Sequence, residues 1–195
     1  MKKRIASPLL FIGLTLILIS LCLTLLFGIR TKKGAEKRQQ IAAKLSEMLP
    51  ERTPGVAEMY PFTVMPVFEF DGVDYTAVLE IPAFGVRLPV ADRWDSRKLW
   101  VCPTRFWGSA YDNSLVIGGN DAQGQFAFCD KIQNGTTVTI TDMIGAEFSY
   151  TVTRIDRARH AETPWLIDEK SDLTLFCYDM YTMEYIAVRC VSAIG

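Results

Sequence analysis

Cysteine and histidine are the reactive side chain types of this 195-residue chain, and both are sparse. The chain holds a single histidine, His160, and its cysteines show no CxxC spacing, so the sequence predicts neither a zinc site nor any other metal or cofactor. A cysteine nucleophile needs a neighbouring base, and His160 is the one imidazole that the sequence offers. In an oxidising compartment four of the five cysteines could form disulfides, whose pairing the sequence does not give. The five are Cys22, Cys102, Cys129, Cys177 and Cys190.

The surroundings of His160 and Cys177 favour ordinary structural roles. His160 precedes a polar connection at 161–171, where a solvated loop histidine is expected. Cys177 ends the apolar segment LTLFC, and alternate residues from Leu173 to Cys177 share one face of a strand. We interpret Cys177 as a buried core thiol, because only a one-residue bulge would turn it to the opposite face.

Short apolar or alternating segments separated by turn residues dominate the chain after residue 67. Such a pattern, with little helix, is typical of a closed or nearly closed β-barrel. One short helix is expected at 122–131. The predicted strands lie at 75–81, 86–89, 113–117, 136–141, 148–153, 173–177 and 185–191.

The N-terminal part contains a long apolar segment, Leu9–Ile29, without a charged residue. As a helix it would measure about 30 Å, the thickness of the hydrocarbon core of a bilayer. The segment is longer than the apolar region of a cleaved signal peptide, and no A-x-A site follows it, so an uncleaved transmembrane signal anchor is predicted. Basic residues flank it on both sides, which leaves its orientation open.

A juxtamembrane helix is expected at 34–49, and Pro50, Pro54, Pro61 and Pro66 then predict an irregular linker. The predicted organisation is therefore a cytoplasmic basic tail (1–8), a transmembrane anchor (9–29), a juxtamembrane helix with a proline-containing linker (30–66) and a β-barrel domain (67–195).

The net charge of −1 conceals an asymmetry along the chain. Residues 1–38 carry a net charge of +7, which leaves −8 for the rest. A domain this acidic is a poor candidate for binding nucleic acid or anionic lipid, whereas the basic cluster beside the apolar segment suits contact with headgroups.

The order of the predicted strands resembles that of sortases. The segment EIPAFGVRLPV (80–90) resembles the opening "I-P-x-x-G-V-x-L-P-V", and NSLVIGG (113–119), with Phe126 and 134–135, resembles "N-x-V-I-A-G-H … F … L … G-D". The segment DMIGAEFSYTV (142–152) resembles the next hairpin, and DLTLFCY (172–178) with VRC (188–190) resembles the last two strands. The resemblance covers about 75–195 in unbroken order.

This resemblance implies a mostly β fold: a sortase-like closed β-barrel of short antiparallel and mixed strands with one or two short helices, preceded by an N-terminal transmembrane helix. It also implies a cysteine transpeptidase of Gram-positive cell walls. In that chemistry a Cys attacks the Thr–Gly amide of a sorting signal, a His protonates the leaving amine, and an Arg stabilises the oxyanion.

The three catalytic positions hold other residues in this chain. Asn120 stands at the His position, and an amide cannot carry the proton. Tyr178 aligns with the Cys position, one residue after Cys177, and Tyr185 aligns with the Arg position.

Substitutes for the missing groups are conceivable: Cys177 as nucleophile, His160 as base and Arg189 as oxyanion donor. Each has an ordinary alternative, as a core thiol, a loop residue and a surface residue. Trp165, in the connection that walls the sortase groove, either contacts a ligand or pins the loop to the barrel. The aromatic residues at 94–107 either cap one barrel end or form a subsite for glycan.

We therefore expect a single-pass cell-membrane protein, with the bulk of the chain extracytoplasmic, that is a degenerate sortase. Its expected partners are sorting-signal peptides, pilins or an active sortase. Two alternatives remain: an active enzyme that uses Cys177 with a non-standard base, and a structural barrel within a membrane complex.

Overall fold

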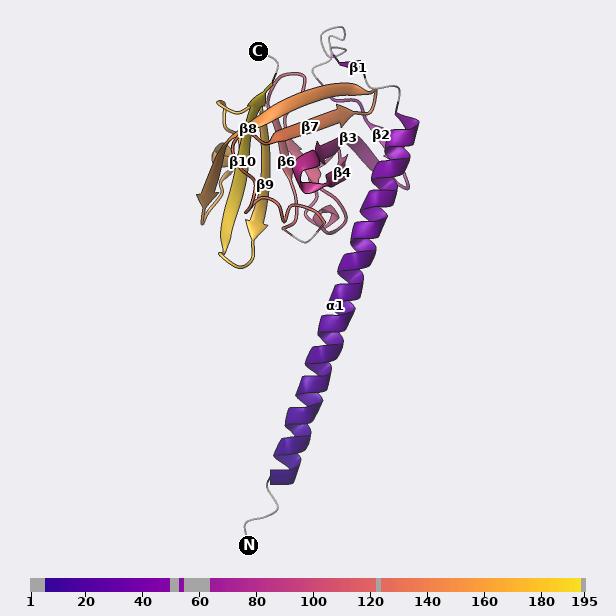
Figure 1. Cartoon of the computed structure of the whole chain (residues 1–195), viewed down its shortest axis with the longest axis vertical. Helices are drawn as coiled ribbons and strands as arrows, with labels where there is room; N and C mark the ends of the chain where they lie inside the picture. The colour runs from indigo at the N-terminus through magenta and orange to yellow at the C-terminus, as the bar shows by residue number, and fades with distance from the viewer. Residues whose placement is uncertain (1–5, 50–52, 55–63, 122–123, 194–195) are drawn as a thin grey trace. The chain divides into compact units, whose positions relative to one another are not determined.

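The computed structural model describes residues 6–49, 53–54, 64–121 and 124–193. The chain forms two units, Met1–Gly34 and Ala35–Gly195. Figure 1 shows one long helix and a set of strands that curl into a barrel.

The first unit consists of the N-terminal part of α1, a helix that extends from Ala6 to Met48. Its large apolar side chains from Leu10 to Ile29 are 51–71% exposed. The described part of the chain holds one helix that is long and apolar enough to cross a membrane, and it is this one. The separate helix expected at 34–49 is a continuation of α1, because the basic residues after Ile29 are good helix formers and Gly34 alone does not end a helix.

Residues 35–48 of α1 pack against the barrel within the second unit. Ile41 and Leu45 are buried in a cluster with Tyr75, Val78, Ala91 and Cys102. The amphipathic face predicted from residues 41, 42, 45 and 49 is thus the face that meets the sheet.

Ten strands form the sheet of the described residues. Eight of them close into a barrel in the order β8-β10-β9-β6-β5-β4-β3-β7, with β7 pairing both β3 and β8. The other two strands lie outside the closed barrel: β2 pairs with β3, and β1 pairs with β8. Their bounds are β1 Thr53–Pro54, β2 Phe68–Phe70, β3 Val73–Ile81, β4 Val86–Ala91, β5 Thr104–Trp107, β6 Leu115–Gly118, β7 Thr137–Asp142, β8 Ala146–Ala158, β9 Leu173–Asp179 and β10 Glu184–Ser192.

In the described parts of the chain, short helices connect the strands: the 3-10 helices η2 (Pro82–Phe84) and η3 (Lys98–Trp100), and α2 (Thr163–Leu166). The mostly β, closed-barrel prediction is therefore confirmed. The short helix expected at 122–131 is wrong: residues 124–131 form turns, because Gly124 adopts φ +77° and Phe126, Phe128 and Cys129 all point into the core. Most of the expected proline-containing linker lies outside the described residues.

The barrel interior is filled by the inward-facing residues of the strands, among them Leu79, Ile117, Ile140, Leu175 and Val188. All five are at most 1% exposed. The barrel is thus a packed core rather than a channel, and its outer face is where polar and aromatic groups can act.

Candidate functional site

Three adjacent strands bring Asn120, Tyr178 and Tyr185 to one end of the barrel. Tyr178 on β9 and Tyr185 on β10 are register partners, and their ring centroids lie 4.9 Å apart. Strand β6 runs parallel to β9 with Gly118 opposite Phe176, and the Gly119 N–H donates to the Phe176 carbonyl at 2.9 Å. Asn120 follows directly, beside the end of β9.

The backbone of Asn120 is held on both sides. Its N–H donates to Oε1 of Gln125 at 2.5 Å, and its carbonyl accepts from the Phe126 N–H at 2.9 Å. Gln125 is buried and donates in turn to the Leu99 carbonyl at 3.0 Å. We did not predict from the sequence that Gln125 would hold the backbone of Asn120. The signal for it in the sequence is a polar residue directly before the apolar Phe126.

Cys177 lies on the other face of β9, inside the barrel. Its side chain is 1% exposed and packs in the core with Cys129 and Cys190. Burial, together with a hydrogen bond to Cys177, holds the pKa of the Cys129 thiol well above its usual range. Burial raises the pKa of Cys190 to about 12. Cys129 and Cys190 are therefore protonated at neutral pH, a state in which a thiol is a poor nucleophile.

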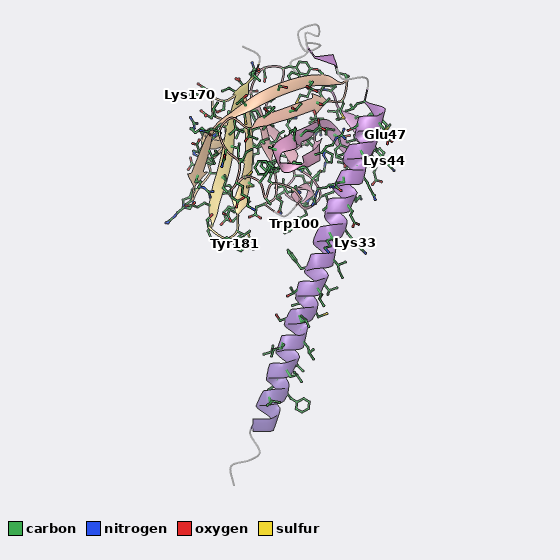
Figure 2. The ribbon with its side chains drawn as sticks, in the orientation of Figure 1. Lys33, Lys44, Glu47, Trp100, Lys170 and Tyr181 are labelled. Atoms are coloured by element: carbon green, nitrogen blue, oxygen red, sulfur yellow. The ribbon has the colours of Figure 1, made fainter. Side chains whose placement is uncertain are left out.

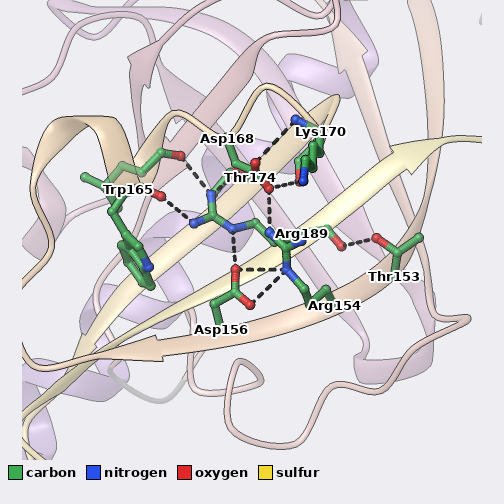
Figure 3. Close-up of polar contacts among 10 residues, drawn as sticks. Thr153, Arg154, Asp156, Trp165, Asp168, Lys170, Thr174 and Arg189 are labelled. Atoms are coloured by element: carbon green, nitrogen blue, oxygen red, sulfur yellow. Dashed lines mark hydrogen bonds and ion pairs between the residues drawn. The ribbon is translucent and has the colours of Figure 1, made fainter.

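Arg189 is buried on the outer side of the sheet, 1% exposed, and Figure 3 shows its guanidinium enclosed by polar partners. Its Nε pairs with Asp156 Oδ2 at 3.1 Å, and its Nη1 donates to Oγ1 of Thr174 at 3.0 Å. Its remaining bonds reach the carbonyls of Trp165 and Leu166 at 2.5 and 2.9 Å, at the end of α2. Arg189 is thus committed to holding this loop, about four residues along β10 from Tyr185.

Trp165 and Leu166 lie over the outer face of the same strands. Leu166 packs with Val116, Phe176 and Ala187, and Trp165 joins this cluster from its edge. The Arg189 guanidinium lies 5.1 Å from the centre of the Trp165 ring. In this geometry Trp165 pins the loop to the barrel.

His160 is exposed in the connection that follows β8, near the strand pair formed by Ala158 and Tyr185. Cys177 faces the barrel interior while Arg189 is bound to the loop around α2, so the three proposed substitutes do not share one open surface.

The aromatic residues at 94–107 separate into two groups. Trp94 and Phe106 pack on Phe176, with ring centroids 5.6 and 5.5 Å from it, although Trp94 is still 40% exposed. Trp100 and Trp107 are more exposed, at 70% and 54%. Beside them an open pocket of about 480 Å³ is lined by residues of 92–94 and 105–109, including Trp94 and Trp107. The expected cap over one barrel end therefore forms only in part.

No protein-family model matches the chain, and no curated protein matches it. Solved structures do. Sortase A from Corynebacterium diphtheriae superposes with a TM-score of 0.56 at 16% identity, over 85% of each chain. A sortase D5 transpeptidase of Clostridium perfringens gives 0.53 at 20% identity, over 62% of this chain and 79% of that chain. Sortase C1 of Streptococcus agalactiae gives 0.55 at 18% identity, over 65% and 72%. At these identities the likeness shows the fold: the chain has the sortase fold.

Proposed function

Because the chain has the sortase fold, we propose that it is a membrane-anchored, extracytoplasmic protein that binds a segment of a surface protein or pilin without cleaving it. The observation that carries this proposal is the pairing of Tyr178 with Tyr185 beside Asn120. The resemblance assigns these positions to a nucleophile, an oxyanion donor and an acid, and here they hold two phenols and an amide.

The chemistry of these residues supports binding better than turnover. Cleaving an amide needs an activated nucleophile and a group that gives the leaving amine a proton. The carboxamide of Asn120 donates and accepts hydrogen bonds but does not act as an acid or a base, and neither tyrosine supplies the thiol nucleophile or the guanidinium oxyanion donor of that chemistry. A pair of half-buried tyrosines does offer apolar ring surface with a polar edge, the kind of surface on which an extended peptide docks.

The membrane anchor in this proposal is supported by α1. Its apolar residues 10–29 are exposed, and the length of this segment suits a bilayer. Basic residues follow at 30, 32 and 33, where headgroups would lie.

A direct test uses the full chain in lipid nanodiscs with fluorescein-labelled sorting-signal peptides. We expect saturable binding by anisotropy and intact peptide by mass spectrometry after prolonged incubation. Tyr178→Ala and Tyr185→Ala each weaken binding roughly tenfold, the usual effect of removing an aromatic anchor. Phe68→Ala, an exposed aromatic residue on β2, which pairs with β3 and not with β9 or β10, is the matched aromatic control and leaves affinity unchanged.

The same experiment separates the two alternatives. A thioester adduct on the intact protein that disappears in Cys177→Ala would replace this proposal with an enzyme that uses Cys177. Absence of peptide binding, or affinity unaffected by both tyrosine changes, would favour a structural role for the barrel.

A further inference from the structure

Two loops place large apolar side chains in solvent at one end of the barrel. Trp100 and Val101, at the end of η3, are 70% and 42% exposed. Met180, Tyr181 and Met183, in the turn between β9 and β10, are 69%, 95% and 60% exposed. Figure 2 shows Trp100 and Tyr181 at the same end of the barrel, with Lys170 at the other. We call residues 98–101 and 179–184 the exposed tips.

Asp121 and Gln125 each make a hydrogen bond to one of the two tips. The Met180 N–H donates to Asp121 Oδ2 at 3.3 Å, and Gln125 Nε2 donates to the Leu99 carbonyl at 3.0 Å. The tips therefore belong to one surface, which also contains the ends of β6 and β9 and the start of β10.

The chain enters the second unit at this same surface. Arg38 is buried, and its Nε donates to the Gly124 carbonyl at 3.2 Å while its Nη1 donates to the Val101 carbonyl at 3.4 Å. Arg38 lies nine positions after Ile29, the last apolar residue of the proposed span. Nine positions measure about 13 Å as a helix and at most about 30 Å fully extended, which limits how far the Arg38 backbone can lie from the end of the proposed span.

The side chains of the tips are those that favour the boundary between headgroups and hydrocarbon. Trp and Tyr concentrate at this depth because an apolar ring carries one polar group, and Met adapts its shape to irregular apolar surroundings. The turn itself is internally satisfied: Asp179 accepts from the Tyr181 N–H at 2.8 Å and the Thr182 hydroxyl at 2.7 Å. Tyr181 can therefore enter the interface without leaving its own N–H or the Thr182 hydroxyl unpaired.

We propose that the exposed tips form a second membrane contact, in which Trp100 and Tyr181 insert at the headgroup boundary. The inference rests on the proposed membrane anchor. Since residues 39–195 carry a net charge of −8, the contact is apolar rather than electrostatic, and it suits a zwitterionic lipid surface.

This contact has a consequence for the binding function. Asn120, Tyr178 and Tyr185 lie at the barrel end that would face the bilayer. A ligand of this site would therefore be a segment held close to the membrane, such as the membrane-proximal part of a partner protein.

Tryptophan quenching by brominated lipid tests the contact in the full chain. The protein is reconstituted in phosphatidylcholine vesicles with and without brominated acyl chains, and it is compared with Trp100→Phe and Trp107→Phe. Trp107 is 54% exposed on β5 and is the matched control. We expect Trp100→Phe to remove most of the quenched emission and Trp107→Phe to retain it. Equal quenching in the wild type and Trp100→Phe overturns the inference.

A gain-of-signal pair makes the test independent of Trp100. In the Trp100→Phe background, Tyr181→Trp restores quenching, whereas Lys170→Trp at the other barrel end does not. Equal quenching of the two contradicts the proposed orientation. Failure of the chain to float with the vesicles would overturn the anchor itself, while flotation without quenching of Trp100 overturns only the second contact.

Discussion

Arg189 is the residue that fixes α2 to the outer face of β8, β9 and β10. Its guanidinium meets Asp156 on β8, Thr174 on β9 and two carbonyls of α2, so it joins three elements that are distant in sequence. A charge this deeply buried is stable only while each of these partners stays in place.

Removing that charge is expected to destabilise the barrel strongly. Arg189→Ala leaves the α2 carbonyls and the Thr174 hydroxyl without this donor, whereas Asp156 keeps its ion pair with Arg154, and we expect the free energy of unfolding to fall by about 2–5 kcal/mol. Urea unfolding followed by tryptophan fluorescence measures the change. Arg157→Ala, an exposed arginine on β8, should stay within about 0.5 kcal/mol. A similar small effect for Arg189→Ala would mean that the loop is held by apolar contacts alone.

Asp179 gives the turn of the exposed tips a defined pH dependence. Hydrogen bonds from the Thr182 hydroxyl and then the Tyr181 N–H lower the pKa of Asp179 below its usual value of 3.8. A lowered carboxyl pKa stabilises the fold above the unfolded-state pKa, and this stability is lost as the pH falls through the folded-state pKa.

We expect Thr182→Ala to raise the pKa of Asp179 towards 3.8, because the largest cause of its shift is removed. Carbon chemical shifts of the Asp179 carboxyl, recorded through an acid titration, measure this directly. Thr163→Ala at the start of α2 provides the threonine control and leaves the titration unchanged. A pKa insensitive to Thr182→Ala would show that the backbone donors alone set it.

Single residues also mark the limit of sequence reasoning. The alternation of β9 was enough to predict that Cys177 shares a face with Leu173 and Leu175, since that face follows from strand geometry. The burial of Arg189 was not predictable, because it depends on α2 folding across β10. Nothing periodic in 159–172 indicates that coverage.

At the scale of elements, the strands with a clear period of two were predicted within a few residues, as for β7 and β9. Strand β5 was missed. It has four residues, its Arg105 replaces an apolar contact with an ion pair to Asp92 at 2.6 Å, and its aromatic content suggested a loop cap. The continuous helix α1 was predicted as two segments because the basic cluster after Ile29 looked like a boundary.

The end of β6 is expected to tolerate no side chain at Gly119. A Cβ there would lie 2.6 Å from both Cδ atoms of the Phe126 ring, which is fully buried. Gly119→Ala therefore forces the ring or the strand end to move, and we expect it to lower the free energy of unfolding by about 1–3 kcal/mol.

Because Asn120 follows directly, the same change should also weaken peptide binding. Urea unfolding and the anisotropy assay measure the two effects. Thr137→Ala, an exposed strand position on β7, is the control. An unchanged stability in Gly119→Ala would mean that Phe126 repacks freely.

At the scale of the whole molecule, the division into two units assigns part of α1 to the barrel. Ile41, Ala42 and Leu45 are at most 5% exposed and cover Tyr75 and its neighbours. This helical segment is therefore part of the fold of the second unit as well as a tether.

Two truncations test that role. A chain beginning at Ala35 keeps the covering residues, and we expect it to unfold cooperatively in urea. A chain beginning at Pro50 uncovers an apolar patch that includes Tyr75, Val78, Ala91 and Cys102. It loses the burial of two large aliphatic side chains, each contributing about 1.5–3 kcal/mol, so its unfolding midpoint should fall markedly and it should bind a hydrophobic dye.

The unfolding midpoint of Leu45→Ala in the longer chain should lie between those of the two truncations, with a loss of about 2–5 kcal/mol in the free energy of unfolding. Lys44→Ala on the exposed side should have almost no effect. Equal midpoints for the two truncations would show that the barrel is complete without the helix, and that residues 35–48 serve only to connect it to the membrane.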